Sequence, residues 1–382
     1  AVHGSRLSEY PAKAMPKVTQ KTIAAEAGVS RSTVAAVLND FNGVSIGEEK
    51  RRRVLEAIER LGYSPNRFAQ AIRGGRTRMI GVLHKSGGRK DRWMGRLISS
   101  VVAEIRRRNY DFVVNDVHWF EDDGEASWKF MLDANPEGLV LVSPMASTPR
   151  ANVEEAKARG IPIICMGGDL GDEFPTFDLD MRKASRALTN HVLSGGKRRP
   201  RLVLYRAFDW SDGGREFAAA RNHFREQGFL EACEARGIPS RDREVLDLPA
   251  AFAEGHSHYV AGKITMERLL ESDAPPDAVF FKNDRWAIGA LTACHERGIR
   301  VPEDVAVTGY QNDEFGEYTN PPLTTIDPPC ERIAEAAAEA LFRLIDARGD
   351  AAGYPEKTPP VRFPCALVVR KSTPTPAMVA GG

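Results

Sequence analysis

Short apolar runs alternate with helical patterns through most of this 382-residue chain, and the alternation restricts its fold more than any other feature. The runs are "MIGVL", "YDFVVND", "GLVLVS", "IPIICM", "RLVLY", "AVFF" and "VAVTGY". Between them lie amphipathic stretches such as 97–108, 183–193 and 333–346. Strands separated by helices form parallel sheets with right-handed crossovers. The runs fall into two sets of similar size, so we expect an α/β core of two doubly wound parallel-sheet subdomains.

Length and composition limit the class of protein. A chain of 382 residues predicts two or three units, and 42% hydrophobic with 27% charged residues is typical of a globular protein. No apolar run approaches the roughly 18 residues that span a bilayer, and the first residues lack the apolar segment of a signal peptide. The five cysteines are widely spaced, which argues against disulfides and a zinc site. We therefore expect a cytoplasmic protein without a metal or other cofactor.

Charge divides the chain unevenly. Residues 1–78 hold 14 Lys and Arg against 7 Asp and Glu, a net charge of +7, which leaves −6 for the remainder because the total is +1. A basic head on an acidic body suggests that the head meets a polyanion. A solvated basic surface would explain the charge alone equally well.

The basic head has the pattern of two short helices joined by a tight turn. Thr19 is a candidate N-cap for a first helix, and Gly28 can end that helix in the left-handed conformation. Ser30 then caps a second helix, which is short and polar on its outer face. The apolar positions of the two helices are Ile23, Ala24, Ala27, Val34, Val37 and Leu38.

A third helix should follow. "SIGE", Ser45 to Glu48, has the spacing of a capping box, and Val54, Leu55, Ile58 and Leu61 recur at helical intervals before Gly62. Two helices joined by a glycine turn, with a supporting third, describe a helix-turn-helix, whose second helix enters the major groove of DNA. A three-helix bundle without a partner is the alternative for this segment alone.

The stretches "VTQKTIAAEAGVSRSTVAAVLN" and "RVLEAIERLGYSPNRFAQAIRGGRTRMIGVL" resemble the start of the lactose/galactose repressor (LacI/GalR) family, and the resemblance runs from Val18 to about Arg370. It implies a DNA-binding transcriptional regulator, expected to be a repressor, with a periplasmic-binding-protein-like core. It also implies a hinge helix over residues 66–73, which enters the minor groove with Ile72 as an apolar wedge. The DNA-contacting positions implied are Thr19, Ser30, Arg31, Ser32, Thr33, Asn39, Asn66, Ala69 and Ile72.

Two departures from the family pattern affect DNA readout. Ala35 and Ala36 stand where the family often has Ser-Arg, so a bidentate base contact of roughly 1–3 kcal/mol is missing. Arg31 and Ser32 must then carry more of the readout. The loop "DFNGVSIGEEK" also departs from the usual spacing.

The resemblance implies a small-molecule effector between the subdomains, a sugar or sugar derivative. Trp93, Trp119, Trp210 and Trp286 lie at or soon after strand ends, where parallel sheets bind ligands, and their rings could stack on a sugar, whereas Trp128 is expected in the core. Motif matches such as "FFKNDRWAIGAL" and "VPEDVAVTGYQNDEF" add the polar candidates Asp180, Arg215, Asn283, Asp284 and Gln311. The basic loop "HKSGGRKDRWM" suits an acidic or phosphorylated sugar, or is simply solvated.

Other classes of function are less well supported. An enzyme is disfavoured because no G-x-G-x-x-G follows the first strand and no catalytic grouping has a recognisable spacing. A sugar-binding transport protein would need a secretory signal and no helix-turn-helix. A DNA-binding regulator with a nucleobase effector, a phosphorylated effector or no effector remains open.

These observations predict the following organisation. We expect a disordered extension over 1–16, the helix-turn-helix domain over 17–64, the hinge helix and linker over 65–77, the core over 78–370 and a disordered tail over 371–382. Within the core, 78–178 with 310–326 should form one subdomain and 180–308 with 328–370 the other, with crossings near 178–181, 308–311 and 325–328. The tail lacks leucine heptads, so a homodimer on near-palindromic DNA is expected rather than a tetramer.

Overall fold

The structure is a computed structural model of the chain. It describes residues 18–39, 46–63, 77–85, 92–117, 123–144, 148–168, 170–171, 173–204, 211–247, 257–347 and 358–375. The chain divides into two compact units, residues 1–77 and 78–382, and each is described by itself.

The first unit contains three short helices in the order that the sequence predicts. They are α1 (Gln20–Ala27), α2 (Arg31–Asn39) and α3 (Glu48–Leu61). The backbone N–H of Thr22 donates to Thr19 Oγ1 at 3.3 Å, and Gly28 adopts the left-handed conformation with φ 62°. The N–H of Thr33 donates to Ser30 Oγ at 3.1 Å. Each of these three local predictions is therefore confirmed.

The core of this unit is made by Ile23, Val34 and Val54, which are fully buried where the three helices meet. Two expectations for α3 are wrong. Its N-cap is Gly47, without a side-chain cap, so the helix begins too late for Ser45 to start a capping box. Leu55 was expected on the inner face but is 51% exposed, because Val54 and Ala57 take the positions that face α1 and α2.

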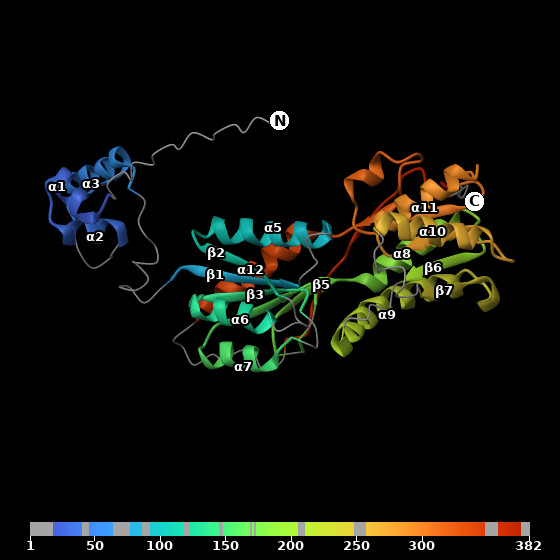
Figure 1. Cartoon of the computed structure of the whole chain (residues 1–382), viewed down its shortest axis with the longest axis horizontal. Coiled ribbons are helices and arrows are strands. Elements are labelled where there is room, and N and C mark those ends of the chain that lie inside the picture. Colours follow the sequence, from blue (N-terminus) through green and yellow to red (C-terminus); the bar gives the residue numbers. More distant parts are fainter. Residues whose placement is uncertain are drawn as a thin grey trace, which may run out of the picture. The chain divides into compact units, whose positions relative to one another are not determined.

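The second unit consists of two lobes, each built on a parallel sheet (Figure 1). The first lobe has the strand order β11-β5-β4-β3-β1-β2, with β1 (Met79–Lys85), β2 (Asp111–Val117), β3 (Gly138–Val142), β4 (Ile163–Met166), β5 (Thr176–Leu179) and β11 (Val361–Phe363). The second lobe has the order β7-β6-β8-β9, with β6 (Pro200–Leu204), β7 (Glu244–Asp247), β8 (Ala278–Phe281) and β9 (Ala306–Thr308). All pairings within these two sheets are parallel, as predicted.

Helices cover both faces of the first sheet (Figure 1). Successive residues of β3 point to opposite faces, so Val140 packs against α5 (Arg92–Arg107) and α12 (Cys330–Asp346), whereas Leu139 and Leu141 pack against α6 (Asp123–Asp133) and α7 (Arg150–Ala158). Trp128 of α6 is fully buried in the latter layer, which confirms its predicted place in the core. This arrangement is the doubly wound fold that the alternating pattern predicts.

The second sheet is covered in the same way. Leu202 and Leu204 of β6 pack with α8 (Met181–Ser194) and α9 (Ser211–Ala235) on one face. Val203 packs with α10 (His258–Leu270) and α11 (Asp284–Glu296) on the other. A 3-10 turn, η2 (Ser240–Asp242), precedes β7, and a second, η4 (Glu314–Glu317), follows β9.

The chain crosses between the lobes at three places, two of which lie at or next to predicted ones (178–181 and 325–328). The crossings lie at Asp180, at Pro328–Pro329 and at 364–365, where β11 of the first sheet gives way to β12 (Ala366–Val368), which pairs antiparallel with β10 (Thr325–Asp327). The predicted crossing at 308–311 is wrong. Residues 310–324 stay with the second lobe, because Thr308 bridges Thr324 and Leu323 packs in that lobe's core.

The assignment of 310–326 to the first subdomain is therefore also wrong, and that of 328–370 to the second holds only for 366–370, where β12 pairs with β10. Helix α12 packs against α5 and against β3, β4 and β5, and β11 pairs with β5, so both belong to the first lobe.

The start of the predicted disordered tail is ordered. Ser372 is fully buried, its Oγ donates to the carbonyl of Val307 at 2.6 Å, and it accepts from the backbone N–H of Thr324 at 2.8 Å. Thr373 lies within 2.8 Å of the Thr324 hydroxyl, so residues 371–375 close the second lobe beside β9. Among the residues that the structure describes, no helix is long and apolar enough to cross a membrane.

Candidate functional site

The N-terminal end of α2 presents a cluster of hydroxyl groups. Ser30 Oγ lies 2.7 Å from Ser32 Oγ and 2.8 Å from Thr33 Oγ1, and it also accepts the Thr33 backbone N–H. The N-cap thus fixes the orientation of the neighbouring hydroxyls while it satisfies a helix donor. Ser32 is exposed, so its hydroxyl can still reach a groove edge from this fixed position.

Arg31 is the cation beside this cluster. It is exposed at the first position of α2 and makes no ion pair with any residue that the structure describes, so its guanidinium is available for a base edge or a phosphate. Arg52 on α3 differs, because it is held by Glu49 and Glu56, each at 2.8 Å. Thr19 is occupied as the cap of α1.

The second candidate site begins where β8 ends in the second lobe. Asn283 caps α11 by accepting the backbone N–H of Trp286 at 3.0 Å. Asp284 follows as the first residue of the helix and is fully buried. Its Oδ2 accepts the backbone N–H of Asp313 at 2.5 Å, and its Oδ1 accepts the Thr325 hydroxyl at 2.6 Å. This carboxylate therefore ties α11 to the segment after β9 and to the strand that leads to the first lobe.

Burial raises the pKa of Asp284 to about 7, because the loss of solvent outweighs the hydrogen bonds from Thr325 and Asp313 that lower it. The surroundings are tight as well as dry. A Cβ on Gly309 would lie 2.1 Å from Asp284 Oδ1, so only glycine fits opposite the carboxylate.

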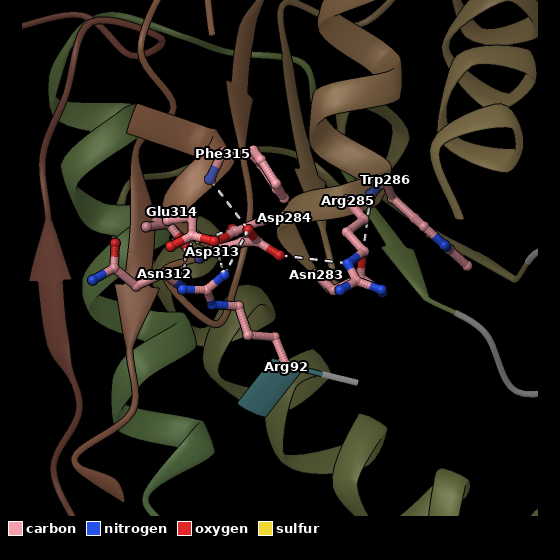
Figure 2. A network of polar contacts seen from close by, with 10 residues as sticks. Arg92, Asn283, Asp284, Arg285, Trp286, Asn312, Asp313, Glu314 and Phe315 are labelled. Atoms are coloured by element: carbon pink, nitrogen blue, oxygen red, sulfur yellow. Dashed lines mark hydrogen bonds and ion pairs between the residues drawn. The ribbon is translucent and has the colours of Figure 1, made fainter. Parts of the chain in front are cut away.

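A chain of ion pairs continues from this carboxylate toward the first lobe (Figure 2). Asp313 caps η4 by accepting the N–H of Phe315, and its other oxygen lies 3.4 Å from Arg285 Nε. Arg92, the first residue of α5, places Nη1 2.6 Å from Glu314 Oε1 and 3.7 Å from Asp313 Oδ1. The network thus joins α11, η4 and α5.

Comparisons with known proteins match both the helical head and the two-lobed core. Residues 19–66 match the lacI family of bacterial regulatory proteins, and residues 189–373 match the periplasmic binding protein-like domain. The HTH-type transcriptional repressor PurR of Yersinia pestis bv. Antiqua (strain Antiqua) is 30% identical over 341 residues, covering 87% of this chain and 92% of the relative. The chain belongs to the lacI family.

Solved structures extend the likeness to the whole fold. The lac repressor dimer bound to operator and the anti-inducer ONPF has a TM-score of 0.73 at 23% identity, covering 94% of this chain and 99% of the other. The complex of the transcriptional regulator CelR with cellobiose has a TM-score of 0.62 at 26% identity, covering 93% and 99%. The protein is accordingly a lacI-family transcriptional regulator with a DNA-binding head and an effector-binding core.

The tryptophans predicted to stack on an effector are not uniformly open. Trp93 and Trp286 are each 4% exposed and belong to the cores of the first and second lobes. In this arrangement a ligand ring could stack on either indole only after neighbouring side chains move. Trp119, Trp210 and the side chain of Arg215 lie outside the described residues, as do Asn66, Ala69, Ile72 and the side chain of Asn39.

Two polar candidates lie at or near the chain crossings. Asp180 caps α8, accepting the backbone N–H of Lys183 at 3.1 Å, and its own N–H donates to Phe363 at 2.8 Å across the adjacent crossing. Gln311 has φ of 101°, a strained value for a residue with a side chain, and its N–H donates to Ile326 at 2.9 Å. Both backbones are therefore fixed by the strands that join the lobes.

Sequence reasoning missed the roles of Arg92, Arg285, Asp313 and Glu314. Arg92 was grouped with a basic loop, and its acidic partners follow a strand more than two hundred residues later in the chain. No local pattern could have paired them.

Proposed function

We propose that this lacI-family regulator is a repressor that binds a near-palindromic operator as a homodimer. The observation that carries the proposal is the exposed guanidinium of Arg31, which pairs with no described acid, beside the fixed Ser30–Ser32 hydroxyls at the start of α2. A helix of this kind reads base edges with its first residues. The lac repressor dimer seen on operator supports both the DNA target and the two-fold assembly. The proposal includes that the protein acts in the cytoplasm and is not an enzyme.

Operator affinity is controlled, in this proposal, by a sugar or sugar derivative bound between the two lobes. Support comes from the two parallel sheets joined by crossings and from CelR, a structural relative solved with cellobiose. Asp180 and Gln311 are the contacts proposed from the described residues, because each lies at or beside a segment that joins the lobes. Asn283 and Asp284 support the site by positioning the segments around it.

The DNA proposal is tested with a duplex selected from a random library by the full chain. Arg31→Ala should weaken binding to the selected duplex by about five- to 150-fold, the equivalent of roughly 1–3 kcal/mol, and weaken binding to random DNA much less. Arg52→Ala is the matched control, since its guanidinium is already paired on α3. Equal losses on both duplexes would show that Arg31 contacts only phosphate.

The effector proposal is tested by calorimetry against neutral sugars, sugar acids, sugar phosphates and nucleobases. A neutral or acidic sugar should bind, and operator DNA should change its affinity by the same factor by which the sugar changes operator affinity. If only nucleobases give a heat of binding, the effector is a nucleobase and the sugar proposal is wrong. If no compound gives a heat of binding, the proposed effector site is wrong.

A further inference from the structure

Arg92 of the first lobe makes two ion pairs with acidic residues of the second lobe (Figure 2). In the sequence, these acidic residues lie well away from the places where the chain crosses between the lobes. Its Nη1 lies 2.6 Å from Glu314 and 3.7 Å from Asp313. Both acids belong to the second lobe, in the segment that the sequence pattern had assigned to the first.

The base of Arg92 is fixed to the first lobe. The residues that follow it on α5, Trp93, Met94 and Leu97, are buried in that lobe's core, and α5 packs along α12. A shift of the first lobe therefore carries the guanidinium with it.

The acidic side is fixed to the second lobe just as firmly. The backbone N–H of Asp313 is held by the buried carboxylate of Asp284, and Asp313 in turn caps η4. The far end of η4 is held where Leu323, a core residue of the second lobe, donates its N–H to Gly316 at 2.7 Å. Glu314 thus projects from a segment that moves with its lobe.

Arg96, one turn further along α5, provides an internal comparison. Its Nη1 lies 2.8 Å from Asp327, and its exposure of 27% is close to the 31% of Arg92. Its partners, however, are Asp327 at the crossing strand itself and Glu331 at the start of α12 in the first lobe. Because its partners lie at a crossing and within the first lobe, we expect movement of the lobes to change the Arg96 pairs less than the Arg92 pairs.

We propose that Arg92, with Glu314 and Asp313, is an ion-pair latch that holds the two lobes in the arrangement seen here. The latch consists of side chains only, so the lobes can separate without breaking the fold. It is partly exposed, so salt weakens it: the Debye length falls from about 10 Å at 0.1 M to about 3 Å at 1 M ionic strength. An exposed pair of this kind changes the ratio of latched to unlatched molecules by up to about fivefold. Only the consequence for operator affinity rests on the proposed function.

The test measures the distance between the lobes in the full chain, without effector or DNA. Fluorophores are attached through noncanonical amino acids at Glu154 on α7 and Thr292 on α11, both exposed and one in each lobe. Single-molecule energy transfer is recorded at low and high salt for the wild type, Arg92→Gln and Arg96→Gln. Thermal unfolding of each variant establishes that it is folded.

The wild type should show mostly one distance at low salt and a larger share of longer distances at high salt. Arg92→Gln should show the longer distances already at low salt, by up to about fivefold in ratio, with little further response to salt. Arg96→Gln should behave as the wild type. Arg92→Glu should open the lobes, and adding Glu314→Arg should restore the shorter distance.

A distance distribution for Arg92→Gln that matches the wild type at both salt concentrations would overturn the latch, as would failure of the reversed pair to restore it. Operator binding is measured on the same samples. If the wild type binds no operator but the lobe distances change as expected, the proposed function is rejected and the latch is retained. Normal operator binding with unresponsive distances would reject the latch alone.

Discussion

Asp284→Ala removes a buried carboxylate that accepts hydrogen bonds from two separate segments, the Asp313 backbone and the Thr325 side chain. Each donor would be left without this acceptor in a dry site, at a cost of about 1–3 kcal/mol apiece. We therefore expect the free energy of unfolding to fall by about 3–5 kcal/mol, since the small cavity adds to the loss of the two bonds.

Asp284→Asn is the matched variant. An amide oxygen can accept the Asp313 N–H, and the amide nitrogen can donate to Thr325, whose hydroxyl can rotate to accept. The shape of the site is kept and no charge is buried, so Asn should cost less than about 1 kcal/mol at neutral pH. Urea unfolding followed by tryptophan fluorescence measures both variants, with Trp286 buried two residues away.

The same pair of variants separates a structural role from a ligand contact. A residue whose role is to bind an effector could be changed to Ala with little loss of stability. A free energy of unfolding for Asp284→Ala within about 1 kcal/mol of the wild type, with effector binding abolished, would refute the structural role and restore the contact predicted from the sequence pattern.

The remaining predictions concern pH and helix packing. Because the folded-state pKa of Asp284 is raised to about 7 from an ordinary 3.8, its contribution to stability is fully present below about pH 4 and is lost as pH rises through about 7. The stability of the wild type relative to Asp284→Asn should therefore be greater at pH 5 than at pH 8 in urea titrations, and an equal difference at both would contradict the raised pKa. Gly289→Ala should destabilise the second lobe by about 1–3 kcal/mol or more, because its Cβ would lie 1.8 Å from the carbonyl oxygen of Tyr259 on α10. Gly95→Ala on α5 meets nothing within 4 Å and should instead stabilise by about 0.5–1 kcal/mol, so equal melting temperatures for the two would reject the close contact of α10 and α11.

The DNA-binding head could be predicted closely because its signals are local. Thr19, Gly28 and Ser30 each act on backbone groups within a few residues, so residue type and spacing are enough to place α1 and α2. The start of α3 was misplaced for the same reason. Gly47 gives no side-chain cap, and a nearby serine with the right spacing gave a stronger local signal than the helix that actually forms.

The buried strands of both sheets were also predictable, since β1, β3, β4, β6 and β8 are apolar runs covered on both faces. The three-residue strands β10, β11 and β12 were not. The equally short β9 was predicted because it is fully buried within an apolar run, whereas β11 and β12 are partly exposed and β10 ends on a charged residue. Because β11 and β12 flank a change of lobe, the crossing at 364–365 was missed and one was placed at 308–311 instead, whereas those near 178–181 and 325–328 were found.

Asp284 was placed correctly by its sequence motif, but the role that the motif suggested, contact with a ligand, differs from the one seen in the structure. The Asn-Asp pair at the end of β8 was identified from its sequence context, where polar side chains usually face a ligand. In the structure Asn283 caps a helix, and Asp284 turns inward to hold the segment that carries Asp313 and Glu314. That segment reaches Arg92 of the other lobe. Asp284 therefore serves as an acceptor for two donors that face it, the Asp313 N–H and the Thr325 hydroxyl. Any effect of this residue on the effector response would pass through the position of η4 and the contact between the lobes.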